Sequence, residues 1–423
     1  KTAYEIMPSL VGSEMCIRDR STIYKSEDPV STLRNDLTKD QDMTGKVMTV
    51  SGPIHPDQLG LTLMHEHLFI ALYKAIAPDH HTPMGDWCLW DQSLTMDNLA
   101  KARDRGPIKD NWILSDEETA IKEASEFRIH GGGTIVEVTS YGIRRDPIAM
   151  KRVSHATGLN IIMGAGWYQK LYHPNEMDQW TVEELTKEIV NDIIVGVSGS
   201  GIKSGIIGEV GVEGNPITEN EIKNIRASGR ASLVTGAPIS FHRGGVDRER
   251  LDVIKILEEE GVDLSRVIFG HSDTIAYNLP LMLDLLKRGV YIQFDLLGRV
   301  GVPLRFAPDI DDNKAFFSSA GTAVVAEAIP QLINAGYADR ILLSQDICTK
   351  MQLKRFGGTG YSFILEKFLP ELRSRDVSED HILAMMVENP KRILTFVKPQ
   401  PVSYTHLRAH ETRHDLVCRL LLE

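Results

Sequence analysis

Two histidines two residues apart mark the first segment of the chain in which chemistry is expected. His65 and His67 lie in the segment LTLMHEHLF. On an extended strand, residues i and i+2 point to the same face, so both imidazoles can converge on one metal ion. The segment is not the helical HExxH motif of metalloproteases, because Phe69 stands where the second histidine would be. Two such histidines can also be ordinary strand residues, so the pair alone does not establish a metal site.

Four more ionisable residues stand at or near the ends of later apolar runs. They are Glu209 in GIIGEVG, His242 in PISFHRGG, His271 in VIFGHSD and Asp346 in ILLSQDI. Each could singly be a core residue with a satisfied hydrogen bond, but an ionisable side chain in an apolar interior needs compensation. Two divalent cations would compensate all six together.

Imidazole and carboxylate ligands suit zinc and also other first-row metals. Two ions about 4 Å apart need a ligand that can bridge them. Glu209 offers two oxygens and comes from a central run, so it is the natural bridge. The residue types therefore predict two divalent metal ions, with zinc expected.

The elements that must position these residues follow a βα alternation. Short apolar runs, continuous as in strands covered on both faces, alternate with longer segments of helical period. Eight runs can be counted, at 61–65, 134–139, 159–164, 205–210, 237–242, 266–271, 290–295 and 340–346. Eight βα units without a linker predict one (β/α)8 TIM barrel, whose active site lies at the carboxyl ends of the strands. The six candidate ligands fall on the first, fourth, fifth, sixth and eighth runs.

Helix starts and long loops complete this arrangement. Ser115 with Glu118, Thr181 with Glu184 and Thr218 with Glu221 have the spacing of capping boxes. The stretch after His67 and the stretch 297–322 are longer than a βα unit needs, and we expect them to form lids or pocket walls.

Composition and charge limit the class of protein. The chain has 423 residues, 47 Lys and Arg against 58 Asp and Glu, and a net charge of -11. These values exclude a disordered chain, collagen and a coiled coil. Without a basic patch, neither nucleic acid nor an anionic membrane surface is an expected partner. We expect a small-molecule substrate, and a homodimer is the commonest default assembly.

Both ends of the chain differ from the rest. Residues 1–20 and 401–423 resemble translated sequencing-adapter DNA, and 21–42 are polar, so 1–42 is expected to be a non-domain segment. The barrel is expected to span 43–400, with Met43 as the natural start, and to fold without either end. Within it, Cys88 and Cys348 are too few for a disulfide framework, which suits a reducing cytoplasm. Each is expected to be a small buried apolar residue.

The pattern of candidate ligands resembles that of the amidohydrolase superfamily, in particular its phosphotriesterase family. The segments GIIGEVG, SQD with the downstream GGTGYSFIL, and ENPKRILTF resemble the phosphotriesterase-related proteins more closely than the phosphotriesterases themselves. The resemblance covers about Lys46 to Phe396. It implies that His65, His67 and Asp346 bind the more buried ion and that His242 and His271 bind the more exposed one. The phosphotriesterases proper have a carboxylated lysine at the position of Glu209.

Several residues near the expected mouth of the barrel could contact substrate or simply form rim salt bridges and packed rings. They are Arg144, Arg145, Asp146, Trp167, Tyr168 and Arg243. Tyr168 and Arg243 are the predicted substrate-binding residues. Arg243 follows a candidate ligand and precedes two glycines, which allow close approach of a substrate.

These observations predict a dinuclear metal-dependent hydrolase that uses a metal-bridging hydroxide. Asp346 is the predicted catalytic residue, taking the proton from the attacking water and returning it to the leaving group. The resemblance implies lactones, carboxylic esters, N-acyl amides or phosphotriesters as substrates, and we favour the first three. The alternatives are a phosphotriester hydrolase of the aryldialkylphosphatase type and an inactive metal-binding barrel.

Overall fold

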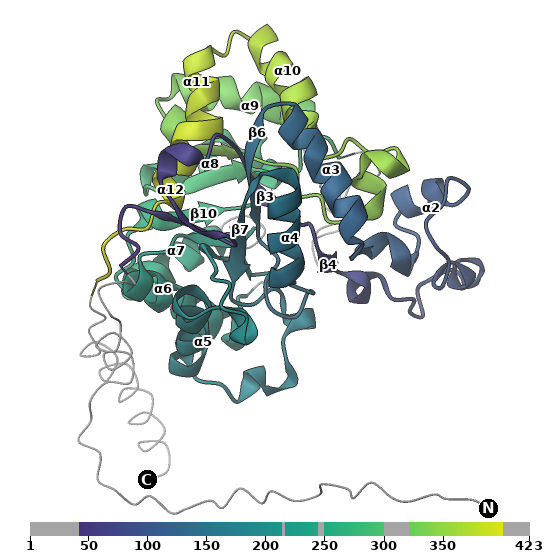
Figure 1. Cartoon of the computed structure of the whole chain (residues 1–423), viewed down its shortest axis with the longest axis horizontal. Coiled ribbons are helices and arrows are strands. Elements are labelled where there is room, and N and C mark those ends of the chain that lie inside the picture. Colours follow the sequence, from purple (N-terminus) through teal and green to yellow (C-terminus); the bar gives the residue numbers. More distant parts are fainter. Residues whose placement is uncertain (1–41, 214–215, 244–248, 300–320, 401–423) are drawn as a thin grey trace, which may run out of the picture.

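A computed structural model describes residues 42–213, 216–243, 249–299 and 321–400 (Figure 1). The two end segments expected to lie outside the barrel, residues 1–41 and 401–423, fall outside the described residues. So does most of the second long loop. The expectations for these segments therefore stay predictions.

Eight strands form one sheet whose spatial order follows the chain, and every neighbouring pair within it is parallel. Each of the eight predicted runs overlaps one of these strands, although the last four strands are shorter than predicted. The strands are β3 (Leu61–Glu66), β6 (Gly132–Glu137), β7 (Asn160–Ala165), β8 (Ile206–Gly211), β9 (Ile239–His242), β10 (Val267–Phe269), β11 (Tyr291–Phe294) and β12 (Ile341–Leu343).

The first and last of these strands meet at the carboxyl end of the barrel. The amide of Asp346 donates to the carbonyl of His65 at 3.1 Å, and the amide of His65 donates to Oγ of Ser344 at 2.9 Å. The sheet therefore closes on itself, and the predicted (β/α)8 barrel is confirmed.

Helices cover the outside of the sheet, as crossover helices between parallel strands must. Their buried faces are apolar: α5 buries Leu185, Ile189 and Ile193 at helical spacing. A hairpin of β1 (Val47–Thr49) and β2 (Gly52–Ile54) precedes the barrel. Figure 1 shows the helices around the strands. They are α3 (Glu117–Ile129), α4 (Pro147–Thr157), α5 (Val182–Ile194), α6 (Glu219–Thr235), α7 (Glu249–Glu259), α8 (Leu279–Lys287), α9 (Thr322–Asn334), α10 (Leu369–Ser374), α11 (Glu379–Leu383) and α12 (Asn389–Leu394).

Two of the three predicted capping boxes are present. Thr181 caps α5 and Thr218 caps α6, each with its glutamate partner. The box predicted at Ser115 is wrong, because α3 starts one residue later and the carboxylate of Asp116 accepts from the amide of Thr119 at 2.7 Å. A carboxylate at this position also interacts favourably with the helix dipole.

The first long loop forms a small lobe between β3 and α3, visible on the right of Figure 1. It contains α2 (Leu99–Arg103), several 3-10 turns and the pair β4 (Ile70–Ala71) and β5 (Ile113–Leu114). Leu94, Leu99, Ala102 and Ile108 form a separate buried cluster in it. Cys88, expected to be buried, is exposed in this lobe, whereas Cys348 is buried as predicted. No apolar helix long enough to span a bilayer occurs in the described residues.

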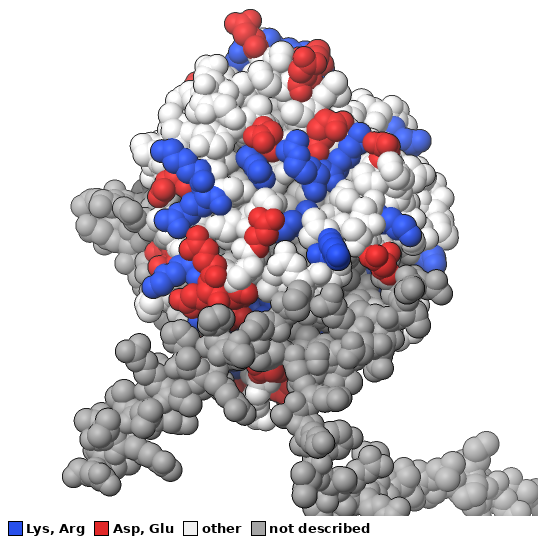
Figure 2. All heavy atoms as spheres, turned by 90° about the vertical axis from the view of Figure 1, so that its left-hand side faces the viewer, with Lys and Arg blue, Asp and Glu red and all other residues white. Residues whose placement is uncertain are grey.

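Acidic and basic side chains are mixed on the surface visible in Figure 2. On the face shown in Figure 2, lysines and arginines are interspersed with aspartates and glutamates. That face carries no large patch of one sign.

Candidate metal centre

The structure brings all six predicted ligands together at the carboxyl end of the barrel. His65 lies in β3 and His271 just after β10, and the centroids of their rings are only 4.9 Å apart. Every one of the six is at most 8% exposed. They are His65 and His67 at the end of β3, Glu209 in β8, His242 in β9, and His271 and Asp346 just after β10 and β12.

The six side chains form two triads. In the first, Nε2 of His67 lies 3.3 Å and Nε2 of His65 lies 3.9 Å from Oδ1 of Asp346. In the second, Nδ1 of His242 lies 2.7 Å and Nε2 of His271 lies 3.8 Å from Oε2 of Glu209. The ligand atoms of each triad all lie within 4.8 Å of one another.

Glu209 also faces the first triad. Its Oε1 is 3.3 Å from Nε2 of His67, and its Oε2 is 3.4 Å from Nε2 of His65. One carboxylate thus contacts both histidine pairs, which is the geometry a bridging ligand requires.

The donor set fits a pair of divalent ions. Nε2 of His65 is buried and has no hydrogen-bond partner among the described residues. A buried polar atom without a partner is costly, and a metal ion would satisfy it. Four imidazoles with two carboxylates form a set of the hardness that zinc and neighbouring metals take.

The pKa shifts show how the charges balance without metal. Burial opposes the charged imidazoles, but the carboxylates of Glu209 and Asp346, joined at His65 by that of Asp295, outweigh it. They raise the pKa of His65 to about 9 and of His67 to about 10. Burial likewise opposes the carboxylate of Glu209, but His242 and His65 hold its pKa well below the usual range. Because a metal binds neutral imidazole, metal binding must release these protons.

A carboxylate behind the site, Asp295, orients two of the histidines. Its Oδ1 lies 2.6 Å from Nδ1 of His271, and its Oδ2 lies 3.3 Å from Nδ1 of His65. Gln293 donates to Oδ2 of Asp295 at 2.7 Å and holds it in place. Asp295 is not among the residues predicted for the site. It ends the seventh predicted run, so the strand-end rule that found Asp346 would have found it.

Glu66, between the two histidines, points the other way and holds the loop that carries Asp346. Its carboxylate accepts from Oγ of Ser344 at 2.7 Å and from the amides of Gln345 and Ile347 at 2.8 and 2.9 Å. Burial raises the pKa of Glu66 to about 7. This residue was not predicted either, although a carboxylate inside a strand covered on both faces needs partners.

Three of the site residues adopt a left-handed backbone conformation. The φ angles of Arg243, His271 and Asp346 are 58°, 48° and 48°. Residues other than glycine rarely adopt this region of backbone angles, and such strain concentrates at functional sites. All three side chains line the pocket at the mouth of the barrel.

A pocket with a cavity volume of about 200 Å³ opens onto the triads. The predicted substrate-binding residues Tyr168 and Arg243 both line it. The Tyr168 hydroxyl lies 3.3 Å from Nε2 of His242, and the side-chain Nε2 of Gln169 donates to the same nitrogen at 2.7 Å. Arg243 forms an ion pair with Glu213. Tyr168 and Gln169 therefore fix the orientation of the His242 ring.

The other rim candidates do not line this pocket and have structural contacts instead. Arg145 donates to the carbonyl of Gly164 at 2.8 Å and pairs with Asp192. Asp146 caps α4, and Trp167 packs against Trp180 with ring centroids 5.9 Å apart. Arg144 is exposed outside the pocket. Conversely, Arg105, Arg299 and Cys348 line the pocket and were not predicted to do so.

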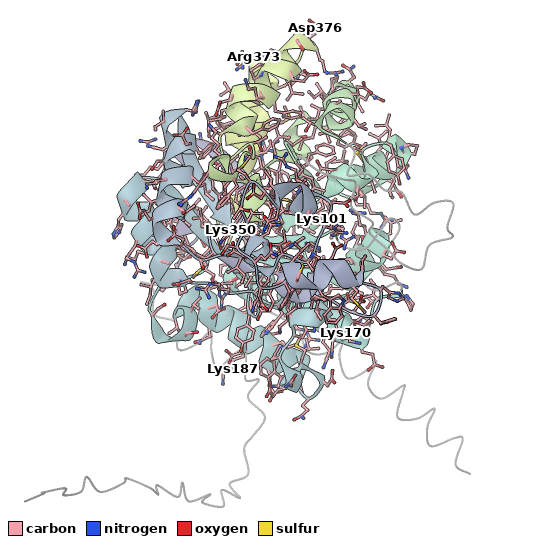
Figure 3. All side chains as sticks on the ribbon, turned by 90° about the vertical axis from the view of Figure 1, so that its right-hand side faces the viewer. Lys101, Lys170, Lys187, Lys350, Arg373 and Asp376 are labelled. Carbon is pink, nitrogen blue, oxygen red and sulfur yellow. The ribbon has the colours of Figure 1, made fainter. Side chains whose placement is uncertain are left out.

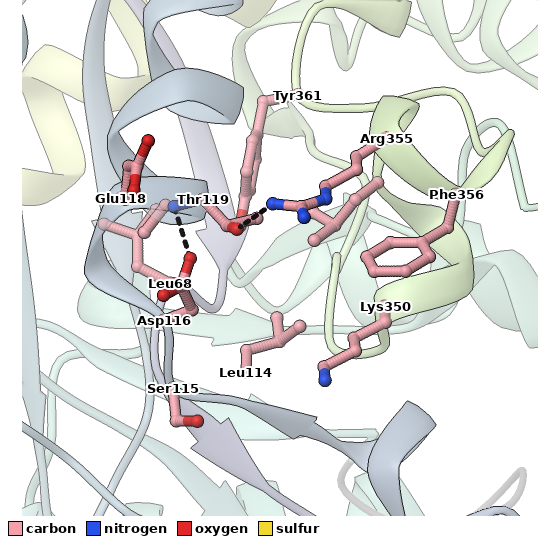
Figure 4. A pocket seen from close by; sticks show the side chains of 12 residues that line it. Leu68, Leu114, Ser115, Asp116, Glu118, Thr119, Lys350, Arg355, Phe356 and Tyr361 are labelled. Carbon is pink, nitrogen blue, oxygen red and sulfur yellow. Dashed lines mark hydrogen bonds between the residues drawn. The ribbon is translucent and has the colours of Figure 1, made fainter. Parts of the chain in front are cut away.

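A second pocket is lined by residues at the start of α3 and by residues between 350 and 361 (Figure 4). It has a cavity volume of about 340 Å³ and is lined by residues that include Leu68, Arg355, Phe356 and Tyr361. None of the six predicted ligands lines it, although the Tyr361 hydroxyl donates to the carbonyl of His67 at 2.8 Å. The chemistry therefore belongs to the smaller pocket.

The contacts of Asp295 with His271 and His65 give a testable expectation. Asp295→Asn keeps the shape but removes the charge that supports His271 and His65, and such outer carboxylates typically contribute roughly 10- to 100-fold to metal affinity. We expect a loss of that size, measured by competition with a chelator. Asp192→Asn, which alters a carboxylate paired with Arg145 outside the pocket, is the matched control. Equal metal affinity in Asp295→Asn and the native protein would contradict the orienting role.

Comparison with known proteins places this geometry among relatives. The sequence profile of the phosphotriesterase family matches residues 45–394. N-acetyltaurine hydrolases of Xenopus tropicalis and Homo sapiens are 38% and 36% identical, and each comparison covers 84% of this chain and 99% of the relative.

Solved structures show the same similarity. A resiniferatoxin-binding protein from Rhodobacter sphaeroides is 33% identical with a TM-score of 0.77, over 85% of this chain and 97% of that one. A lactonase from Listeria monocytogenes is 26% identical with a TM-score of 0.66, over 84% and 100%. The shared sequence and fold extend over the whole barrel, and the chain belongs to the phosphotriesterase family.

Proposed function

We propose that this protein is a metal-dependent hydrolase of N-acyl amides, with two divalent ions, zinc in the first instance, held by the two triads. The observation that carries the proposal is that the Glu209 carboxylate faces both histidine pairs at 2.7 to 3.8 Å. His65, His67 and Asp346 would hold the more buried ion, and His242 with His271 the other.

Two such ions would supply a deprotonated water near neutral pH and polarise the carbonyl of the scissile bond. The protein supplies the proton transfer. The Asp346 carboxylate sits between His67, on its Oδ1, and Arg299, on its Oδ2. It accepts the proton of the attacking water and returns it to the nitrogen of the departing amine.

Burial opposes the charged form of Asp346, but the Arg299 guanidinium and the hydrogen bond to His67 hold the pKa of Asp346 below its usual range. The carboxylate is therefore ionised, as a proton acceptor must be, at neutral pH.

Three observations favour an N-acyl amide over the other substrates. The curated relatives that match over 84% of the chain bear the name N-acetyltaurine hydrolase, and an amide is the bond that name implies. A neighbouring structure is a lactonase, whose reaction also attacks a carbonyl carbon. Glu209 replaces the carboxylated lysine of the phosphotriesterases proper, which weighs against phosphotriesters.

We also propose that the protein works in the cytoplasm. The exposed free thiol of Cys88 suits a reducing compartment of this kind.

The test is a substrate panel with zinc-reconstituted protein. N-acetyltaurine and other N-acetyl amines should release free amine, detected by derivatisation, at rates above those for γ-lactones, aryl esters and a dialkyl aryl phosphate. Chelation should abolish the release, and zinc should restore it. A panel in which only the phosphotriester reacts would overturn the assignment, and a protein that binds two zinc ions but hydrolyses nothing would identify an inactive barrel.

A further inference from the structure

The charges around the pocket divide unequally once the metal ligands are set aside. Three arginines, Arg105, Arg243 and Arg299, line it, and the carboxylates that line it are Glu209, Glu213 and Asp346. Glu209 and Asp346 belong to the triads, and Glu213 pairs with Arg243. If two divalent ions are bound by the triads, no carboxylate among those that line the pocket is left to balance the positive charges of Arg105 and Arg299.

Arg105 forms no ion pair with a carboxylate in the described part of the chain. Its guanidinium makes no hydrogen bond or ion pair to another described residue, and partial burial together with the charge of Arg299 lowers its pKa. It follows shortly after α2 with φ of 60°, a left-handed conformation that costs a non-glycine residue energy. A strained cation close to another cation is expected where a ligand supplies the missing charge.

Arg299 reaches the same pocket from the segment that follows β11. Its Nη2 donates to the carboxylate and to the carbonyl of Asp346, the latter at 3.0 Å. Its Nε is buried and has no hydrogen-bond partner among the described residues. A guanidinium can therefore hold Asp346 with one edge and keep a donor for another acceptor.

The position of these two arginines defines what they could bind. The triads mark the scissile bond, whereas Arg105 belongs to the lobe that forms the outer wall, and its side chain stays partly open to solvent. Guanidinium groups bind carboxylates and other oxyanions through paired N–H donors. A substrate that fills the pocket would bring its far end to Arg105.

Building on the proposed function, we propose that Arg105, with Arg299 beside it, binds an anionic oxyacid group at the end of the substrate remote from the scissile amide. The preferred substrates would be N-acyl amines that carry a sulfonate or a carboxylate. Arg105 would be a specificity-determining residue, because it acts on binding and not on the reacting bond.

The experiment compares three substrates of similar length. N-acetyltaurine carries a sulfonate, N-acetyl-β-alanine a carboxylate, and N-acetyl-2-(methylsulfonyl)ethylamine a neutral sulfone. Arg105→Gln should lower kcat/KM for the anionic substrate or substrates by roughly 10- to 100-fold, mainly through KM, as expected for the loss of charged hydrogen bonds. The neutral sulfone should change by less than about twofold, since it forms no charged bond. The two anionic arms show which oxyacid is bound.

Lys101→Gln is the matched control. It removes one positive charge from α2 in the same lobe, but Lys101 pairs with Asp86 at 3.0 Å and does not line the pocket (Figure 3). We expect it to leave all three rates unchanged. If Lys101→Gln and Arg105→Gln act alike, or if Arg105→Gln affects the neutral sulfone equally, the proposal is wrong.

A binding measurement separates this proposal from the proposed function. Titration calorimetry with ethanesulfonate and with acetate should show binding to the native protein that Arg105→Gln weakens by the same roughly 10- to 100-fold. If the native protein hydrolyses none of the three substrates, the proposed function fails, while the titration still decides the anion site. Binding of both anions unchanged in Arg105→Gln would overturn the anion site itself.

Discussion

Glu209→Gln is expected to remove at least one of the two metal ions and to lower turnover by more than about 100-fold. The change keeps the size of the side chain but removes the charge that faces four histidines. Even carboxylates one step behind a metal contribute roughly 10- to 100-fold, so a bridging ligand should contribute more. Metal content by mass spectrometry and turnover of the best substrate are the two measurements.

Glu213→Gln provides the control for metal content. Glu213 lines the same pocket and belongs to neither triad, so this variant should keep both ions. Assembly of the native protein should also be indifferent to bicarbonate, because Glu209 needs no carboxylation. If Glu209→Gln kept both ions and a near-native rate, or if bicarbonate restored its activity, the bridging role would be refuted.

Asp346→Asn is expected to lower the rate of amide hydrolysis by about 10²- to 10⁴-fold, the range that general acid–base catalysis contributes. The amide oxygen can still face His67, but the side chain can no longer accept a proton. Metal content, measured on the same sample, separates lost proton transfer from lost metal.

The leaving group gives an independent readout of this role. A departing amine needs a proton, whereas a nitrophenolate does not, so Asp346→Asn should affect a nitrophenyl ester much less than an N-acyl amide. Equal losses on the two substrates at full metal occupancy would show that Asp346 does not return the proton.

Much of the fold and of the centre could be predicted because both depend on one local regularity. Strands covered on both faces are continuous apolar runs, and an ionisable residue at the end of such a run is conspicuous. Glu209, His242 and Asp346 follow this rule, and parallel strands bring their carboxyl ends to one edge whatever the detailed register. The six side chains therefore meet although Asp346 lies beyond the observed end of β12.

The residues that escaped prediction depend on contacts with no local signal. Arg105 lies in a lobe of short turns, and its place in the pocket depends on how that lobe packs against the barrel. Glu66 lies between the two histidines of the HEH segment. Its carboxylate accepts hydrogen bonds from the amides of Gln345 and Ile347 only because β3 and β12 meet where the barrel closes. The cap of α3 was misassigned by one residue, because Ser115 and Asp116 are both good caps in sequence.

The contact between β3 and β12 that closes the barrel has a consequence for when the protein can acquire its metal in the cell. His65 and Ser344, which meet there, are 279 residues apart in the chain. At a synthesis rate of about 5 to 20 residues per second, the ribosome needs roughly 15 to 60 s to cover that distance. For most of this interval, His65 and His67 have emerged from the ribosome while Asp346 does not yet exist. In the proposed buried triad, the set of ligands is therefore complete only late in synthesis, and a nascent chain that meets zinc earlier can bind it only through an incomplete set.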